Sequence, residues 1–377
     1  MKMISNPFIL KPYETKELFC NREDEVERLM GYLLGGSDVT LFSPRRMGKT
    51  GLIMRTFDEM GSRFPDILTF YVDIFNTESV EDFNKKLTES IISTLRKESA
   101  VHKFLKFISH LRPTLSYNPI TSEPEVTLIY KDDWEKKTTV EQIFGYLKSL
   151  DKEIVIAIDE FQQIRNYPEV AMEATLRSMI QFMNKIHFIF CGSKKHLMVE
   201  MFTDARRPFY ESTSFLYLHE IRTDAYKDFI IKQFRNYGRD ITDDAIDMIL
   251  NWSRRHTFYT QRLCHTTFNI RRKLIDRNDV NFAINRIFEE FEEQFLELRN
   301  LITPAQWNFL KAVAKEGKVE HPTAKDFLEK YRIGTPANAK RCLTSLLEKE
   351  LLLSTPTRDG ITYTVYNVFL SRWLETC

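Results

Sequence analysis

One segment near the start of the chain restricts its fold more than any other feature. The apolar run at 39–42 leads directly into a loop, and the helix-forming run at 52–55 follows. The loop between them consists of Ser43, Pro44, Arg45, Arg46, Met47, Gly48, Lys49 and Thr50. A strand, a loop ending in Gly-Lys-Thr and a helix, in this order, are the context of a phosphate-binding loop. The segment therefore predicts a strand–loop–helix unit of a nucleotide-binding α/β fold.

Each residue type in this loop has a physical task. Phosphate oxygens need several donors on a concave surface, and successive backbone N–H groups of such a loop supply them. The N-terminus of the following helix adds partial positive charge. Gly48 lets the backbone approach closely, Lys49 reaches the β- and γ-phosphates, and the Thr50 hydroxyl binds Mg²⁺. We include Gly51, which follows the motif directly, among the residues that bind ATP.

The first position of the loop departs from the usual pattern. Ser43 stands where phosphate-binding loops commonly begin with Gly. Serine can make the same turn if its φ stays negative. The alternative interpretation of the segment is an ordinary basic turn before a helix.

Two adjacent carboxylates end a second apolar run. The run at 154–158 leads into Asp159 and Glu160. Catalytic groups of an open α/β sheet lie at the carboxyl ends of its strands, so both acids are expected beside the loop, at the tip of a neighbouring strand. Asp159 would hold Mg²⁺, and Glu160 would orient and deprotonate the attacking water. This favours ATP hydrolysis over a kinase reaction, whereas the pair alone could also be a solvated strand end.

The remaining pattern predicts three domains. Strands alternating with helices imply a mainly parallel sheet covered on both faces, in a core domain at 1–221. Its strands are expected at about 38–43, 67–75, 153–160, 185–193 and 214–221. A Pro-containing segment at about 112–130 is interpreted as an inserted hairpin or an edge strand pair. An all-helical lid at 222–300 follows, and three helices with a hairpin at 301–377 predict a winged helix.

Composition narrows the setting of the protein. The 54 basic and 53 acidic residues leave a formal net charge of +1, and this balance does not indicate an extensive basic surface for nucleic acid. The five cysteines are scattered and lack a CxxC pair, which argues against disulfides and a structural zinc site. No signal peptide and no apolar stretch of membrane-spanning length is evident. We therefore expect a cytoplasmic protein without membrane contact.

Several motifs together resemble the AAA+ superfamily of P-loop ATPases, in the archaeal-ATPase branch near the STAND switch proteins. The resemblance rests on FCNRE at 19–23, SPRRMGKT at 43–50, IAIDEFQQI at 156–164, HFIFCGSKKHLM at 187–198 and RRHTFYTQRLC at 254–264. It is completed by YNVFLSRWL at 366–374. Asn21 and Thr257 depart from the family's usual Gly and Pro.

The resemblance implies roles that spacing alone does not give. Arg22 is expected near the adenine side of the pocket, and Ser193 is similar to the polar sensor of the γ-phosphate. A helix cap is the alternative for Ser193. His256 to Tyr259 resemble a nucleotide-sensing lid motif, with a buried aromatic cluster as the alternative. Arg206 or Arg207 could neutralise transition-state charge, in one subunit or across a homo-oligomer, or form surface ion pairs.

Three functions follow from these observations. The first is an ATP-driven switch in which nucleotide state moves the lid and the winged helix. The second is an ATP-controlled protein that binds duplex DNA through Lys340 and Arg341 on the third winged-helix helix. The third is a non-hydrolysing nucleotide-binding scaffold that presents the winged helix to a protein partner.

Overall fold

The computed structural model describes residues 6–95, 98–120, 123–169 and 171–377, and these form two compact units. The first unit is Lys11–Glu220. The second comprises residues 6–10 together with Ile221–Cys377. The expected α/β core lies in the first unit, and the expected helical and winged-helix segments lie in the second.

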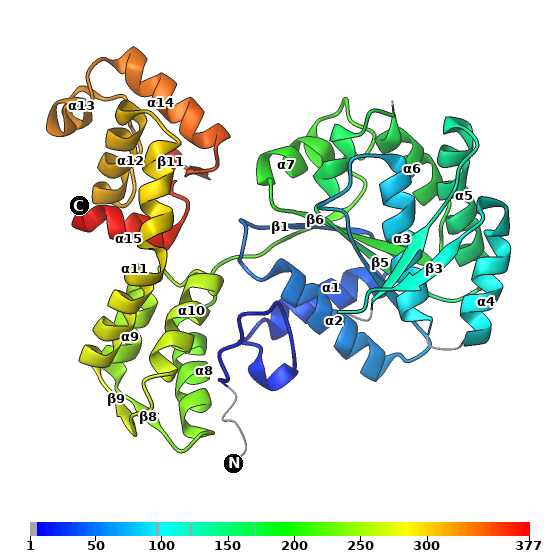
Figure 1. Cartoon of the computed structure of the whole chain (residues 1–377), viewed down its shortest axis with the longest axis horizontal. Helices are drawn as coiled ribbons and strands as arrows, with labels where there is room; N and C mark the ends of the chain where they lie inside the picture. The colour runs from blue at the N-terminus through cyan, green and yellow to red at the C-terminus, as the bar shows by residue number, and fades with distance from the viewer. Residues whose placement is uncertain (1–5, 96–97, 121–122, 170) are drawn as a thin grey trace. The chain divides into compact units, whose positions relative to one another are not determined.

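The first unit contains a five-stranded sheet in which every pairing is parallel (Figure 1). Its strand order is β2-β5-β6-β1-β7. The strands are β1 (Val39–Phe42), β2 (Leu68–Asp73), β5 (Ile154–Asp159), β6 (Ile186–Gly192) and β7 (Ser214–Tyr217). Each of the five expected runs forms one strand, which confirms the predicted parallel sheet.

Strand β5 shows why helices must cover both faces of this sheet. All six of its residues are buried. Ile154, Ile156 and Ile158 pack into one hydrophobic cluster, whereas Val155 and Ala157 pack into another. Successive side chains of a strand point to opposite faces, so an uninterrupted apolar run needs cover on both sides.

Helices supply this cover. Helices α1 and α2 contribute to the cluster that holds Val155, and α3, α5, α6 and α7 contribute to the other. The helices of the unit are α1 (Glu23–Leu34), α2 (Lys49–Arg63), α3 (Val80–Thr94), α4 (Glu98–Phe107), α5 (Asp133–Ser149), α6 (Met172–Ile180) and α7 (Lys195–Thr203). Three short 3-10 helices are η1 (Lys16–Leu18), η2 (Ser109–Leu111) and η3 (Phe161–Asn166).

The Pro-containing insertion is a hairpin separate from the main sheet. Strands β3 (Thr114–Tyr117) and β4 (Pro124–Thr127) pair with each other in antiparallel fashion and form a sheet of their own. This pairing agrees with the inserted-hairpin interpretation of the segment. Part of its expected turn, at 121–122, lies outside the described residues.

The segment expected to be all helical contains one addition. Its helices are α8 (Thr223–Arg235), α9 (Asp243–Trp252), α10 (Thr257–Phe268) and α11 (Arg277–Asn300). Strands β8 (Asp240–Ile241) and β9 (Leu274–Ile275) also form a parallel pair. Strands of only two residues leave no recognisable pattern in a sequence, because an alternation with a period of two needs a longer run.

The last part of the chain has the predicted winged-helix order of three helices and a hairpin. Helices α12 (Pro304–Glu316), α13 (Lys325–Tyr331) and α14 (Pro336–Glu348) precede strands β10 (Leu352–Thr357) and β11 (Gly360–Val365). Val319 adds a bridge to Tyr363 of β11. A further helix, α15 (Val368–Thr376), closes the chain. Among the described residues, no helix combines the length and apolar character that crossing a membrane requires.

Candidate functional site

The loop at 43–50 has the backbone of an anion cradle. Gly48 caps α2 with a φ of 94°, and Arg46 has a φ of 62°. Since α2 begins at Lys49, the N–H groups of its first turn have no partner further back in the helix. Such N–H groups, together with the helix dipole, attract phosphate. A Cβ on Gly51 would lie 2.4 Å from the carbonyl oxygen of Pro12, so only glycine fits there.

Lys49 is buried against the loop that precedes it. Its ammonium lies 3.3 Å from the carbonyl oxygen of Ser43 and 3.2 Å from that of Pro44. Only 7% of the surface of Lys49 is exposed to solvent. Burial lowers the pKa of Lys49, and the charges of Asp159 and Glu160 are near enough to oppose this effect. Thr50, the residue next to Lys49, contacts Asp159 at 2.9 Å, so the lysine lies near the acid pair as expected.

Asp159 is fixed by four hydrogen bonds. Its Oδ2 accepts from Thr50 Oγ1 at 2.9 Å and from the Tyr71 hydroxyl at 2.6 Å. Its Oδ1 accepts from the Cys191 thiol at 3.0 Å and from the Glu160 N–H at 2.9 Å. Burial raises the pKa of Tyr71 and of Cys191, and the charge of Asp159 raises both further. Both groups therefore remain protonated donors at neutral pH.

Glu160 and Ser193 contact each other directly. Glu160 follows β5 with a φ of 58°, a region that non-glycine residues seldom occupy. Its Oε2 accepts hydrogen bonds from the Ser193 hydroxyl at 2.7 Å and from the Ser193 N–H at 3.1 Å. The expected sensor residue and the expected base thus lie together.

The strand order corrects one part of the sequence interpretation. The loop and the acids were expected on neighbouring strand ends, but β6 pairs with both β1 and β5 and lies between them. Ser193 follows β6 directly, so it lies between the strand that carries the loop and the strand that carries the acids. The separation arises because β6 enters the sheet from later in the chain, which no local pattern reveals.

Other predicted residues lie apart from this cluster. Arg22 is 3% exposed, and its guanidinium donates to Glu25 and to the carbonyl oxygen of His219. Arg45 lies over the ring of Phe75, 6.0 Å from its centre. The guanidinium of Arg22 is thus held by Glu25 and His219, and the expected adenine contact of Arg22 stays a prediction.

The two candidate arginines after α7 are engaged with carboxylates. Arg206 forms a two-point ion pair with Asp204, two residues earlier. Arg207 pairs with Glu173 of α6. These pairs agree with the surface ion-pair alternative, although the exposed Arg206 remains accessible. The segment at 256–259 lies in the other unit, at the start of α10.

Sequence reasoning missed three side chains in the cluster. Tyr71 and Cys191 hold Asp159, and Gln162 donates to Glu160 Oε2. Gln162 is part of the motif at 156–164, but the motif does not indicate that its side chain contacts Glu160. Tyr71 and Cys191 lie on β2 and β6, and their approach to Asp159 depends on strand register.

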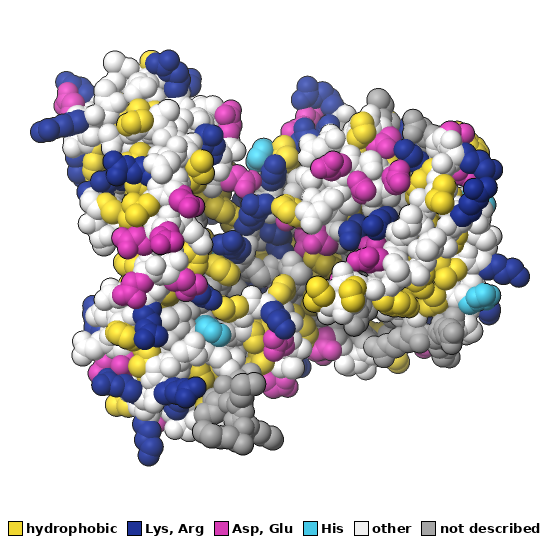
Figure 2. All heavy atoms as spheres, viewed as in Figure 1, with side chains coloured by type: hydrophobic (Ala, Val, Ile, Leu, Met, Phe, Trp, Pro, Cys, Tyr) yellow, Lys and Arg dark blue, Asp and Glu magenta, His cyan; other side chains and the backbone are white. Residues whose placement is uncertain are grey.

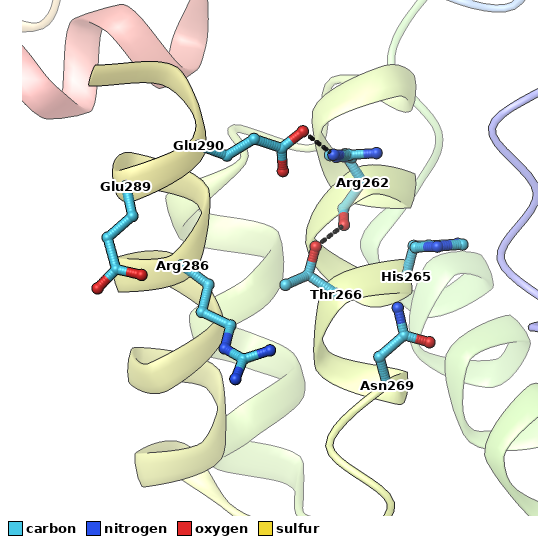
Figure 3. A pocket seen from close by; sticks show the side chains of 7 residues that line it. All are labelled: Arg262, His265, Thr266, Asn269, Arg286, Glu289 and Glu290. Carbon is cyan, nitrogen blue, oxygen red and sulfur yellow. Dashed lines mark hydrogen bonds and ion pairs between the residues drawn. The ribbon is translucent and has the colours of Figure 1, made fainter. Parts of the chain in front are cut away.

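The second unit has a pocket of its own. A pocket of about 520 Å³ lies between α10 and α11 (Figure 3). Arg262 reaches across it to pair with Glu290, while Glu289 points away. The polar lining residues are Arg262, His265, Thr266, Asn269, Arg286, Glu289 and Glu290. Two arginines and two glutamates balance each other, so the pocket carries no strong charge for a polyphosphate.

Comparisons with known proteins agree with this geometry. The family described as "ATPase domain predominantly from Archaea" matches residues 19–254, and a "probable winged helix domain" matches residues 293–376. No curated protein matches the chain significantly in sequence.

Many solved structures are similar to the chain, and three of them share its fold along nearly their whole length. The Walker-type ATPase PABY2304 of Pyrococcus abyssi has a TM-score of 0.66 and 17% identity, covering 98% of this chain and 99% of that one. The ORC2 protein of Aeropyrum pernix, in ADPNP–ADP complexes, has a TM-score of 0.57 and 15% identity, covering 98% and 96%. The ORC1 protein of Aeropyrum pernix, in complex with DNA, has a TM-score of 0.53 and 14% identity, with the same coverage.

The family match extends over more than half of the chain and includes both the loop at 43–50 and the acids at 159–160. The resemblance to P-loop ATPases is thereby confirmed, while placement near the STAND proteins stays a prediction. The chain belongs to the family of ATPase domains found predominantly in Archaea.

Proposed function

We propose that the chain binds ATP with Mg²⁺ at the loop and hydrolyses it to ADP and phosphate. The observation that carries this proposal is the contact of Thr50 with Asp159, at 2.9 Å, beside the buried Lys49. This hydrogen bond joins the phosphate-binding loop after β1 to a carboxylate at the end of a different strand, β5. Family membership and the fold shared with nucleotide-bound ATPases support the same conclusion.

The residues present suit Mg²⁺. This ion prefers oxygen ligands, keeps several waters and commonly binds through one or two protein groups and the phosphates. Thr50 and Asp159 supply two adjacent oxygen ligands of this kind. Among the described residues, no cluster of three or more His, Cys, Asp or Glu forms a dedicated metal cage. Bound there, the ion would neutralise charge on the phosphate oxygens.

The protein groups have separate tasks in the reaction. Lys49 exchanges its contacts with the carbonyl oxygens of the loop for contacts with the β- and γ-phosphates. Glu160 accepts a proton from a water molecule as the water oxygen attacks the γ-phosphorus and the bond to the β-phosphate oxygen breaks. Ser193, which donates a hydrogen bond to Glu160, would sense the γ-phosphate.

Metal removal tests this proposal. We expect phosphate release from ATP by the purified protein to require Mg²⁺ and to fall by at least about 100-fold in EDTA, because charge on the phosphates is then no longer neutralised. A malachite-green assay with and without added Mg²⁺ measures this. Undetectable release in Mg²⁺ would favour the non-hydrolysing scaffold, and equal release in EDTA would remove the metal from the proposal.

We further propose that nucleotide state is coupled to the position of the winged helix through α15. Arg372 of α15 donates to the carbonyl oxygens of Trp252 and Asn251, at 3.0 and 2.9 Å. Phe369 packs on Trp252 and Tyr259, with ring centres 5.3 and 4.7 Å away. Helix α15 thus contacts the end of α9 and Tyr259 of the expected lid motif. We expect the distance between a label on α4 and a label on α14 to differ between the ATP-bound and ADP-bound protein. Equal distances in the two states would contradict the coupling.

Duplex DNA binding is the second candidate function. Lys340 and Arg341 on α14 are exposed and form no ion pair with the described residues, although the chain forms many elsewhere. Figure 2 shows Lys and Arg side chains over α13 and α14. Helix α14 packs on α12, α13 and β10, and Lys340 and Arg341 lie on its exposed side. The DNA complex of the Aeropyrum pernix ORC1 protein shows that a chain of this fold can bind DNA.

Neutralising these two cations tests DNA binding. We expect the double variant Lys340→Ala, Arg341→Ala to weaken duplex binding by about tenfold or more at low salt and to reduce the salt slope by about 2. Fluorescence anisotropy measures both quantities. The control variant Lys325→Ala, Lys330→Ala removes the same charge from α13, where both lysines already pair with glutamates. Equal loss in both variants, or no binding at low salt, would exclude this role for α14.

A further inference from the structure

The carboxylate of Glu160 is held at one oxygen only. Oε2 accepts hydrogen bonds from the N–H and hydroxyl of Ser193 and from Gln162 Nε2. Within the described part of the chain, Oε1 accepts none. Three donors on one oxygen fix the direction of the carboxyl group and leave the other oxygen for a water molecule. These three hydrogen bonds therefore determine that Oε1 is the oxygen that can accept a proton from water.

The orientation of the Gln162 amide follows from this contact. A carboxylate oxygen accepts hydrogen bonds only, so the Nε2 end of the amide must face Glu160. The side chain is 2% exposed, and its Oε1 is buried with no hydrogen-bond partner among the described residues. A buried carbonyl without a partner lowers stability, and such groups in native proteins call for an explanation. The explanation that fits here is that the amide of Gln162 is needed to position Glu160, at a cost in stability.

Gly192 provides the space for this amide. A Cβ at position 192 would lie 1.9 Å from Gln162 Oε1 and 3.0 Å from its Cδ. Gly192 ends β6 and directly precedes Ser193, the other residue that holds Glu160. One strand end thus supplies both a donor to the carboxylate and the gap that admits the second donor.

We propose that Gln162 is a positioning residue that fixes the Glu160 carboxylate for attack of water on the γ-phosphate, in the space left by Gly192. The inference rests on the proposed function, since it needs Glu160 to be the base. Glutamate has three rotatable side-chain bonds, and productive geometry must be held within a fraction of an ångström. Ser193 alone holds the carboxylate from one side, and Gln162 adds the second point that stops it from turning.

The variant Gln162→Met separates positioning from structural support. Methionine has a similar length and no polar atoms that need partners, so the orphaned carbonyl disappears with the donor. We expect the melting temperature to stay equal or rise, the KM for ATP to stay within about twofold, and kcat to fall about 10- to 100-fold. Gly192→Ala, which displaces the amide, should lower kcat in the same way. A wild-type kcat in Gln162→Met overturns the proposal.

The neighbouring glutamine provides a matched control. Gln163 donates to the carbonyl oxygen of Phe75 at 3.1 Å and accepts from Asn166, away from Glu160. Gln163→Met should keep the wild-type kcat. An equal loss of kcat in Gln163→Met and Gln162→Met would show a general effect on η3 and overturn the specific role.

A double variant tests whether Gln162 acts through Glu160. In a Glu160→Gln background, Gln162→Met should cause no further loss of kcat; a further loss as large as in the wild type overturns the proposal. If the wild type releases no phosphate, the proposed function itself fails and the inference with it. If Glu160→Gln alone keeps wild-type turnover, ATP hydrolysis stands but Glu160 is not the base, and the inference fails. If Glu160→Gln is inactive while Gln162→Met is not, the positioning role alone fails.

Discussion

Lys49→Ala is expected to weaken ATP binding by at least about 100-fold, or about 2.8 kcal/mol. The ammonium is buried in the loop and bonded to two carbonyl oxygens. A buried point charge interacts with phosphate far more strongly than an exposed one, because water screens it less. Titration calorimetry with ATP and Mg²⁺ measures the dissociation constant of both proteins.

The control for Lys49→Ala removes the same charge from the surface of the same unit. Lys185 is exposed and pairs with Asp151, so Lys185→Ala should leave ATP affinity unchanged. The melting temperature of Lys49→Ala should not fall, since the change removes a buried charge that has no carboxylate within hydrogen-bonding distance among the described residues. ATP affinity within a few-fold of the wild type would show that the loop at 43–50 is not the phosphate site.

Local patterns predicted most elements of the fold because burial leaves a local trace. The run at 154–158 is apolar at successive positions, which only a strand covered on both faces requires, and the structure has such a strand. Strand order leaves no such trace. The place of β6 between β1 and β5 depends on how the whole sheet assembles, so the loop and the acids were wrongly expected on adjacent strands.

The packing role of α15 is a second feature that local patterns did not give. The run at 366–374 contributed to the family resemblance, but its sequence does not say which surface its arginine and aromatic side chains contact. In the structure, Arg372 and Phe369 contact the end of α9 and the start of α10. Contacts between segments more than a hundred residues apart depend on tertiary packing and not on periodicity.

The candidate site divides along the same line. Gly48, Lys49, Thr50 and the acid pair were recognisable because their chemistry follows from residue types in sequence. Tyr71 and Cys191 were not, because a tyrosine or cysteine in a buried strand is an ordinary core residue until the register brings it beside a carboxylate. The residue roles, the STAND relationship and the cytoplasmic location stay predictions.

Glu160→Gln is expected to stop turnover while leaving ATP binding intact. Glutamine has nearly the same shape, and its amide oxygen can still accept hydrogen bonds from Ser193, but it cannot take a proton from water. General bases of this kind contribute about 10²- to 10⁴-fold. We expect kcat to fall by at least about 100-fold with a dissociation constant for ATP within about threefold of the wild type. Single-turnover phosphate release and calorimetry on the same preparation measure both.

A control for Glu160→Gln is Glu27→Gln, which removes the same charge from an exposed pair with Arg63 and should leave kcat unchanged. Equal turnover in Glu160→Gln and the wild type would require a different base. Asp159 is the nearest carboxylate in sequence, yet both of its oxygens already accept two hydrogen bonds each, from Thr50, Tyr71, Cys191 and the Glu160 N–H. A carboxylate occupied in this way has little freedom to accept a proton from water, so full activity of Glu160→Gln would contradict the whole arrangement at this strand end.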